Sequence, residues 1–336
     1  MGGDNAPREM LLGIVAAKKE YGEEYILVGR ETELYSCAKE LGIELGGFEI
    51  VNADDVITMD DEPMSVRQKS ESSMSKGLRM LADGKGDAFV SCGNTGALFT
   101  GATLIVKRAK GVHRAAIAAM MPFNPPMLLL DAGANISVTP EYILQFAIMG
   151  SAYMHKLYGI ESPRVGLLNN GTEESKGTPL QLEAYKVLKD ASERGLGINF
   201  VGNVEAGATP FDVCDVLVTD GFTGNVMLKS MEGLGRLVKG KLKAMFTTPI
   251  GILGALTVKK SLKQFKKDFD VTEHGGSPIL GISKPVITAH GSSNAKAFKN
   301  AIRQAIKYTS ADVVEDISRA ALDYEEMLKK EKETNA

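Results

Sequence analysis

Five short apolar runs in this sequence end in turns of small and polar residues, and this pattern constrains the fold more than any other feature. The runs have the length and the Val and Leu content of buried strands, and each turn contains Gly, Asn, Thr, Asp or Ser. The five run-and-turn segments are 88–97, 127–135, 165–173, 216–225 and 286–293. In an open parallel sheet, ligands bind at the carboxyl ends of the strands, where such turns lie side by side. The pattern therefore predicts one site for a small polar anion, built by turns at one sheet edge.

Helical patterns alternate with strand-like runs along the rest of the chain. Apolar residues recur at helical spacing in 7–21, 31–41, 62–82, 96–108, 140–158 and 180–193. Further strands are predicted at 25–29, 48–52, 115–121 and 199–201. Thr139 is expected to cap the helix at 140–158, and Ser292 or Ser293 to cap one last long helix. This alternation predicts a doubly wound α/β/α sandwich, a parallel sheet covered on both faces, in a single catalytic domain over 1–336.

Residues 226–270 interrupt the alternation. Apolar residues at helical spacing are mixed with basic ones, and an apolar stretch and a second basic amphipathic run follow. The pattern predicts an inserted amphipathic helical hairpin, which either packs on a partner subunit or presents a basic face to an anionic membrane or an acidic protein. The two interpretations are compatible, because a hairpin that forms a dimer can also project its tip. The residues expected at this surface are Ile250, Leu253, Leu256, Lys259, Lys263 and Lys267.

The composition excludes several classes of protein. Of the 336 residues, 44% are hydrophobic and 24% are charged, which is typical of a globular chain. The formal net charge of −3 gives no general attraction to nucleic acid, and no such partner is expected. Three cysteines without CxxC spacing indicate a reduced, cytoplasmic compartment. No run approaches the ~20 apolar residues of a membrane-spanning helix. Dinucleotide, zinc and serine-nucleophile motifs are missing, so we expect neither a cofactor nor a metal.

Six short motifs occur in order over nearly the whole sequence. They cover residues 1–7, 91–97, 129–135, 168–173, 219–225 and 289–293, and TDGFTGN together with AHGSS is the most specific combination. The motifs resemble those of the bacterial phosphate acyltransferase family. This resemblance implies a fold similar to that of the isocitrate and isopropylmalate dehydrogenases and of the phosphotransacetylases.

The resemblance also implies an activity and several partners. Family members convert long-chain acyl-acyl carrier protein and inorganic phosphate to acyl phosphate and free carrier protein, at the start of phospholipid synthesis. They are homodimers that associate peripherally with an anionic membrane, and a further implied partner is the downstream glycerol-3-phosphate acyltransferase. In one respect this sequence departs from the family. Members have a short apolar strand ahead of the MGGD turn, whereas this sequence begins at that turn. Either the start lies upstream of Met1 or the strand is lost, and the anchoring of Asp4 depends on which.

The implied reaction suits polar turns. Phosphate is itself a nucleophile and a pantetheine thiolate is a good leaving group, so no protein nucleophile is required. Catalysis can rest on holding phosphate in line with the thioester carbonyl and on donors that stabilise the oxyanion. The catalytic candidates are Lys176, His290 and Asn225. The candidates for binding phosphate or substrate are Asn94, Thr95, Gly96, Asn135, Asn169, Thr172, Asp220, Thr223, Ser292 and Ser293. For each Asn and Ser the alternative is a role in loop structure, and for Lys176 it is simple solvation.

Other functions stay open at the level of the sequence. One is a short-chain acyl-CoA:phosphate transferase, and another is a divergent dehydrogenase of the related fold. A third is a non-catalytic scaffold at the membrane edge that uses the basic surface from Lys239 to Lys267. Formation of acyl phosphate from carrier-protein thioester and phosphate would separate all of these.

Overall fold

The computed structural model describes residues 1–248, 251, 254, 257–260 and 275–334. Within these residues, eight strands form a mixed sheet in the order β3-β10-β9-β4-β5-β8-β6-β7, and β1 and β2 form a separate parallel pair. The strands are β1 (Ile26–Gly29), β2 (Glu49–Asn52), β3 (Phe89–Ser91), β4 (Ala116–Met121), β5 (Met127–Leu130), β6 (Arg164–Asn169), β7 (Asn199–Glu205), β8 (Val216–Val218), β9 (Ser277–Leu280) and β10 (Val286–Thr288).

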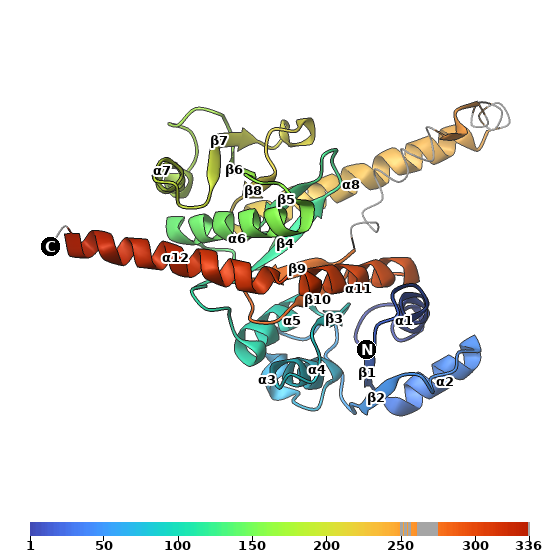
Figure 1. The fold of residues 1–336 in the computed structure, drawn as a ribbon. Coiled ribbons are helices and arrows are strands. Elements are labelled where there is room, and N and C mark those ends of the chain that lie inside the picture. Colours follow the sequence, from blue (N-terminus) through green and yellow to red (C-terminus); the bar gives the residue numbers. More distant parts are fainter. Residues whose placement is uncertain (249–250, 252–253, 255–256, 261–274, 335–336) are drawn as a thin grey trace.

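Helices flank the large sheet (Figure 1). They are α1 (Arg8–Tyr21), α2 (Glu31–Leu41), α3 (Ser65–Gln68), α4 (Ser73–Ala82), α5 (Thr95–Gly101), α6 (Pro140–Tyr158), α7 (Pro179–Glu193), α8 (Gly221–Phe246), α11 (Ala295–Ser310) and α12 (Val313–Thr334). A π-helical turn, η1 (Ala102–Val106), and a 3₁₀ turn, η2 (Thr209–Phe211), complete the described elements. The predicted α/β architecture, a central sheet between helices, is confirmed.

Both faces of the large sheet are buried, as strand β5 shows. Leu128 and Leu130 belong to the core that contains helix α6, whereas Leu129 belongs to the core on the other face, with Leu78 of α4. All three β5 leucines are inaccessible to solvent. Successive residues of a strand point to opposite faces, so a strand covered on both sides must be apolar throughout. This explains why the central strands appear in the sequence as unbroken apolar runs.

The prediction of a parallel sheet is wrong. Strand β3 is parallel to β10, but β9 is antiparallel to both β10 and β4, and β4 is antiparallel to β5. Strands β5, β8, β6 and β7 are parallel to one another. The short segments 122–126 and 281–285 connect β4 to β5 and β9 to β10. A parallel crossover needs about a dozen residues or more, so these short connections allow only antiparallel pairing.

The prediction that the five turns share one edge is therefore wrong as well. The carboxyl ends of β3 and β10 lie along one edge of the sheet, where "edge" means the border that runs across the strands. Strands β5, β6 and β8 run in the opposite direction, so their carboxyl ends lie along the other such edge. The turns form two groups, one after β3 and β10 and one after β5, β6 and β8. Apolar periodicity identifies a strand but carries no information on its direction.

Two predicted helices are divided. The helix expected at 62–82 is split into α3 and α4, and the hydroxyl of Ser72 caps α4 by accepting a hydrogen bond from the Ser75 N–H at 3.2 Å. The last long helix is split into α11 and α12 at Asp312, whose φ of 51° interrupts a right-handed helix. The apolar pattern continues across both breaks and so could not reveal them.

The predicted helix caps are only partly correct. Neither Ser292 nor Ser293 caps α11, because the Asn294 side chain accepts the hydrogen bond from the Ala297 N–H at 2.9 Å. Thr139 does precede α6, but its side chain makes no capping hydrogen bond. The helix expected at 96–108 consists of α5 followed by the π-helical turn η1.

Helix α8 forms the beginning of the predicted hairpin. It starts at Gly221, inside the TDGFTGN motif and before the expected boundary at 226, and it extends away from the sheet (Figure 1). Ile250, Leu253, Leu256, Lys263 and Lys267 lie outside the described residues, so the tip and second arm of the hairpin stay predictions. Lys259 is described and is exposed. None of the helices in the described part of the chain is long and apolar enough to cross a membrane.

A groove of about 550 Å³ lies between β1 and β3. It is lined by both strands and by apolar side chains of α1, α4 and α11, with Met1 among the lining residues. In the described part of the chain, β1 pairs only with β2, and β3 pairs only with β10. Each of β1 and β3 therefore has one side on which no strand is hydrogen-bonded to it. The amino group of Met1 is buried, and this burial lowers its pKa.

A Val- and Ile-rich run of about six residues, joined ahead of Met1, should raise the melting temperature. An added strand would bury apolar side chains, at ~25 cal/mol for each Å² removed from water. The measurement is thermal unfolding of the two proteins, with a Gly- and Ser-rich extension of equal length as the control. Equal melting temperatures for the chain and for its apolar extension would contradict this prediction.

Candidate functional site

Three turns meet at the edge where β3 and β10 end. The Asp4 N–H donates to the Gly291 carbonyl at 2.9 Å, and the Asn5 side chain donates to the Ser292 carbonyl at 3.1 Å. A β-carbon at Gly3 would lie 2.7 Å from Cys92 Sγ and 3.2 Å from the Gly291 carbonyl oxygen, so only glycine allows this close approach. The N-terminal turn is therefore held between the turns that follow β3 and β10.

His290 and Ser292 form a pair on the turn after β10. The Ser292 N–H donates to His290 Nδ1 at 3.2 Å, and the Ser292 hydroxyl lies 2.8 Å from the same nitrogen. Because Nδ1 accepts the backbone N–H, the neutral imidazole carries its proton on Nε2. Both side chains are exposed, whereas Ser293 is buried. This arrangement presents Nε2 as a donor to a substrate oxygen.

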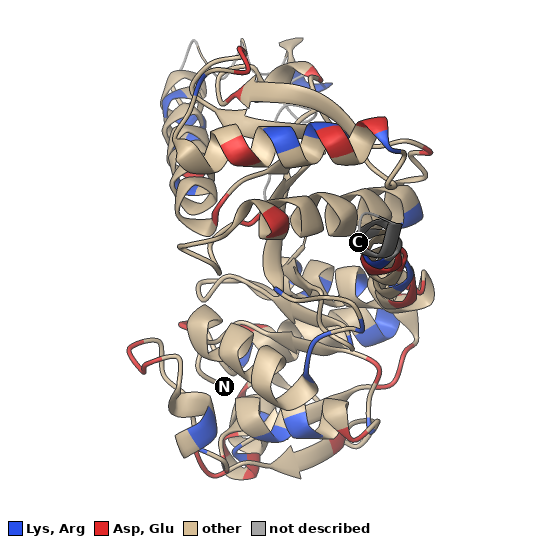
Figure 2. Ribbon diagram, turned by 90° about the vertical axis from the view of Figure 1, so that its left-hand side faces the viewer, with Lys and Arg blue, Asp and Glu red and all other residues tan. Residues whose placement is uncertain are grey.

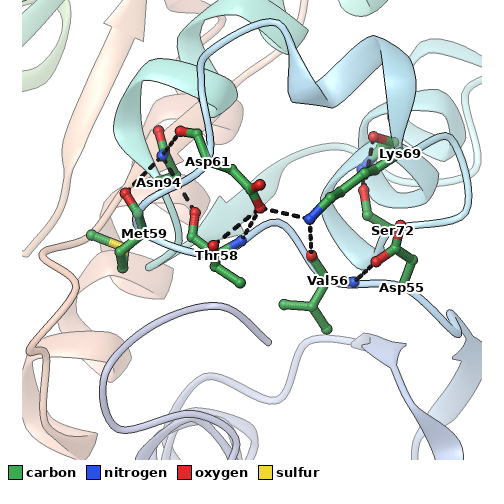
Figure 3. A network of polar contacts seen from close by, with 9 residues as sticks. Asp55, Val56, Thr58, Met59, Asp61, Lys69, Ser72 and Asn94 are labelled. Atoms are coloured by element: carbon green, nitrogen blue, oxygen red, sulfur yellow. Dashed lines mark hydrogen bonds and ion pairs between the residues drawn. The ribbon is translucent and has the colours of Figure 1, made fainter.

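Asn94 holds the segment Thr58–Asp61 against the turn after β3 (Figure 3). Its Nδ2 donates to the carbonyls of Met59 at 3.1 Å and Asp61 at 2.7 Å, and lies 3.4 Å from that of Thr58. Its Oδ1 accepts the Ala97 N–H at 2.9 Å and so caps α5. The amide is thus committed to protein groups, which favours a role in loop structure. Thr95 and Gly96 follow it on the first turn of α5.

Asn94→Ala should lower the free energy of unfolding by ~1–3 kcal/mol. The substitution removes the donor that satisfies the carbonyls of the Thr58–Asp61 segment and also removes a helix cap. Urea unfolding measures the effect, and Asn170→Ala, on an exposed turn, is the matched control. If the stability of Asn94→Ala equals that of the unmodified chain, the amide does not hold this segment.

Asp61 and Lys69 extend this network, and neither was identified from the sequence. Asp61 Oδ2 accepts hydrogen bonds from the Thr58 N–H at 2.7 Å and from Lys69 Nζ at 2.7 Å, and Lys69 also donates to the Val56 carbonyl at 3.2 Å. The hydrogen bond from Lys69 lowers the pKa of Asp61. The acidic run before Pro63 was the only sequence signal for this network, and charge runs of this kind are common on solvated surfaces.

At the opposite edge, Asp131 organises the turn after β5. The carboxylate is fully buried and accepts hydrogen bonds from four backbone N–H groups and from Asn135 Nδ2. Burial raises the pKa of Asp131, while these donors favour the ionised form. Asn135 also donates to the Ala115 carbonyl at 2.8 Å and accepts from Arg114 Nε at 2.6 Å. Its amide is therefore engaged within the protein, and both oxygens of Asp131 accept hydrogen bonds from N–H donors.

The TDGFTGN turn continues this edge. Asp220 caps α8 by accepting hydrogen bonds from the Thr223 N–H at 2.8 Å and from the Thr223 hydroxyl at 2.7 Å. Asn225 is exposed near the start of α8, and a β-carbon at Gly133 would lie 3.3 Å from its Cβ and Cγ. Asn225 therefore lies directly beside the turn after β5, with its amide accessible to a ligand.

The turn after β6 lies next along the same edge. Asn169 Nδ2 donates to the Lys176 carbonyl at 3.1 Å, and Asn203 of β7 donates to the Glu173 carbonyl at 2.9 Å. These bonds shape a loop on which Thr172 and Lys176 are exposed. The predicted site residues thus fall into two groups. Those at the β3–β10 edge are Asn94, Thr95, Gly96, His290, Ser292 and Ser293; those at the opposite edge are Asn135, Asn169, Thr172, Lys176, Asp220, Thr223 and Asn225.

A protein family and several named relatives match nearly the whole chain. The family described as "Fatty acid synthesis protein" matches residues 1–316. The phosphate acyltransferase of Clostridium acetobutylicum is 45% identical over 323 residues, which cover 95% of this chain and 96% of the relative. The phosphate acyltransferase of Thermotoga maritima is 44% identical over 322 residues, which cover 95% of this chain and 94% of the relative.

Solved structures share the fold at low sequence identity. A phosphotransacetylase from Streptococcus pyogenes has a TM-score of 0.63 and 19% identity, covering 93% of this chain and 92% of its own. A 4-hydroxythreonine-4-phosphate dehydrogenase from Klebsiella pneumoniae has a TM-score of 0.53 and 10% identity, covering 90% and 95%. The resemblance inferred from the six motifs is confirmed: the chain belongs to the fatty acid synthesis protein family, whose curated relatives include phosphate acyltransferases.

Proposed function

We propose that this chain transfers a long-chain acyl group from acyl carrier protein to inorganic phosphate, and that the acyl phosphate feeds phospholipid synthesis. The observation that carries the proposal is the 45% identity to a phosphate acyltransferase over 95% of the chain. The exposed polar groups at both sheet edges support it, because they suit an anionic substrate. In this reaction a phosphate oxygen attacks the thioester carbonyl carbon, the C–S bond breaks, and the thiolate leaves and takes up a proton.

The proposed roles follow from what each side chain can donate. The Lys176 ammonium attracts phosphate, and Asn225 supplies an amide donor beside the same sheet edge. His290, with Nδ1 held by Ser292, presents Nε2–H to the oxyanion that develops on the carbonyl or to the leaving thiolate. Donors that are already oriented stabilise the transition state without further reorganisation. Asn94 and Asn135 act in this proposal by holding the turns in place.

A homodimer is part of the proposal. Large apolar side chains are exposed on α8 and on the adjoining turn, with Ile136 75%, Phe222 63% and Leu237 57% accessible. An exposed apolar strip of this kind fits a subunit contact. Within one chain, the two groups of turns lie at opposite edges of the sheet. The dimer would bring one group from each chain to the same substrate. Mixing a Lys176→Ala chain with a His290→Ala chain should then restore part of the activity that each lacks alone, and no gain on mixing would contradict a shared site.

The direct test of function is formation of acyl phosphate by the purified chain. Palmitoyl-acyl carrier protein and phosphate should yield a product that hydroxylamine traps, with no product when phosphate is omitted. Turnover of acetyl-CoA alone would favour a short-chain transferase, and oxidation of a hydroxy acid with a nicotinamide cofactor would favour a dehydrogenase. A chain that binds membranes and turns over none of these substrates would be a scaffold.

Peripheral association with an anionic membrane, in the cytoplasm, is proposed through the hairpin. Lysine and arginine recur along α8, and Lys259 and Lys260 are exposed beyond it. Elsewhere, on the side of the molecule shown in Figure 2, basic residues are mixed with acidic ones. The same surface could receive the acidic carrier protein or the downstream glycerol-3-phosphate acyltransferase, and the membrane is the partner that the following test addresses.

Leu253→Glu should abolish recovery with anionic vesicles in a flotation assay while leaving turnover of soluble substrate unchanged. Each lysine near an anionic bilayer contributes ~1 kcal/mol, which salt screens, whereas an inserted apolar tip adds a contribution that salt does not screen. Binding of the unmodified chain should therefore weaken with salt without vanishing. Unchanged flotation of Leu253→Glu would show that the tip does not enter the membrane.

A further inference from the structure

Met59 is a large apolar side chain held at the surface among polar turns. It is 44% exposed, although most methionines of the described chain are more buried. Its methyl carbon lies 3.0 Å from the position of a β-carbon at residue 291, and Asp4 Oδ2 lies 3.5 Å from the same position. Residue 291 is glycine, so Met59 packs directly on the backbone between His290 and Ser292. An apolar group therefore borders the β3–β10 group of polar turns.

The backbone on both sides of Met59 is fixed by hydrogen bonds (Figure 3). Asn94 Nδ2 donates to the carbonyls of Met59 and Asp61 at 3.1 and 2.7 Å. Asp61 Oδ2 accepts from the Thr58 N–H at 2.7 Å, from the Thr58 hydroxyl at 3.1 Å and from Lys69 Nζ at 2.7 Å. These bonds restrain a short segment that buries little of its own surface. The restraint keeps the Met59 side chain beside the turns instead of letting it fold into a core.

We propose that Met59 is the apolar contact for the acyl chain next to the reacting carbonyl, and that Asp61 is the residue that positions Met59. This inference rests on the proposed function. An acyl thioester joins a polar reacting end to an apolar chain, so its site must offer polar and apolar groups a few ångströms apart. The flexible, polarisable thioether of methionine adapts to a hydrocarbon chain. A contact that is already ordered lowers the entropic cost of binding.

Kinetics with two thioesters test the role of Met59. Met59→Ala should raise KM for palmitoyl-acyl carrier protein about tenfold, the discrimination expected for a small apolar contact, with kcat and the KM for phosphate unchanged. kcat/KM for the acetyl thioester, which has no chain, should stay at its original value. Met59→Leu should retain most of the affinity for palmitoyl. Met64→Ala is the matched control, because Met64 is 43% exposed in the neighbouring segment and contributes none of the three atoms nearest to a β-carbon at residue 291.

Asp61→Asn tests the positioning role. The amide keeps the shape of the side chain but carries no negative charge, so its oxygen is a weaker acceptor for the Thr58 donors and for the Lys69 ammonium. We expect the same selective loss of palmitoyl affinity, with a melting temperature close to that of the unmodified chain. An equal loss on acetyl and palmitoyl thioesters would reduce Asp61 to a structural residue and overturn its positioning role.

The outcomes separate this inference from the proposed function. If the unmodified chain forms acyl phosphate and Met59→Ala keeps its palmitoyl KM, the inference is wrong and the function stands. If the unmodified chain forms no acyl phosphate from either thioester, the proposed function fails and the inference fails with it. Selective loss in Met59→Ala with retention in Met59→Leu and Met64→Ala would establish the contact.

Discussion

His290→Ala and Asn225→Ala should each lower kcat/KM for acyl phosphate formation about a hundredfold, which is the usual effect of removing one oriented donor from a developing oxyanion. Both side chains are exposed, and neither belongs to a core cluster, so folding should be unaffected. Steady-state kinetics with palmitoyl-acyl carrier protein and phosphate measure the loss, and circular dichroism checks the fold.

His155→Ala is a suitable control for this experiment. His155 is an exposed histidine near the end of α6, and its Nδ1 lies 3.1 Å from the Ile160 carbonyl, away from both groups of turns. Its removal should leave kcat/KM unchanged. If kcat/KM of both His290→Ala and Asn225→Ala equals that of the unmodified chain, the proposed site is wrong. A loss in only one of them would identify which sheet edge carries the chemistry.

Asp131→Ala should leave a chain that is barely stable, with a loss of at least ~4 kcal/mol in the free energy of unfolding. The carboxylate is the shared acceptor of four backbone N–H groups and one side-chain amide, all at a buried turn. Each buried donor left without a partner costs ~1–3 kcal/mol, and the total stability of a domain is only ~5–15 kcal/mol.

Urea unfolding followed by fluorescence or circular dichroism measures this loss. Asp323→Ala, at an exposed position of α12, is the matched control and should change stability by no more than ~0.5 kcal/mol. Asp131→Asn keeps the shape but offers one acceptor oxygen, so it should fall between the two. A midpoint for Asp131→Ala equal to that of Asp323→Ala would show that the carboxylate does not hold the turn.

Much of the secondary structure could be predicted because its signals are local. The helices α2 and α6 have the predicted bounds, and the predicted strands deviate from theirs by only a few residues, whereas β9 (Ser277–Leu280) was not predicted at all. A buried strand needs apolar residues on both faces, and an amphipathic helix repeats every 3.6 residues, so both patterns are visible in short windows. The breaks at Ser72 and Asp312 were missed, because a polar cap or a positive φ occupies one residue and leaves the surrounding pattern intact.

The candidate site is less predictable, because residue type and position do not show whether a polar side chain faces a ligand or bonds to the protein. Asn94, Asn135 and Asp220 are polar residues in turns, as a ligand site requires, yet their side chains hydrogen-bond to the protein. An amide that caps a helix and an amide that binds phosphate have the same sequence signature. Asp61 and Lys69 show the converse. They hydrogen-bond to each other in a segment that carries no motif, and the Asp61 carbonyl accepts a hydrogen bond from Asn94 in the turn after β3.

The sequence by itself determined most of the segments that become strands and helices, which turns carry polar groups, and to which family the chain belongs, because these depend on residue identity and short-range spacing. Only the tertiary structure decided the direction of the strands and hence the distribution of the turns over two sheet edges. Strand direction depends on the length of each connection and on which strands become neighbours, and the neighbours in the order β9-β4-β5-β8 come from distant parts of the chain. Side chains of the same type then differ in their role. Those that hydrogen-bond to a distant segment hold the turns, and those without such a bond stay exposed to a substrate.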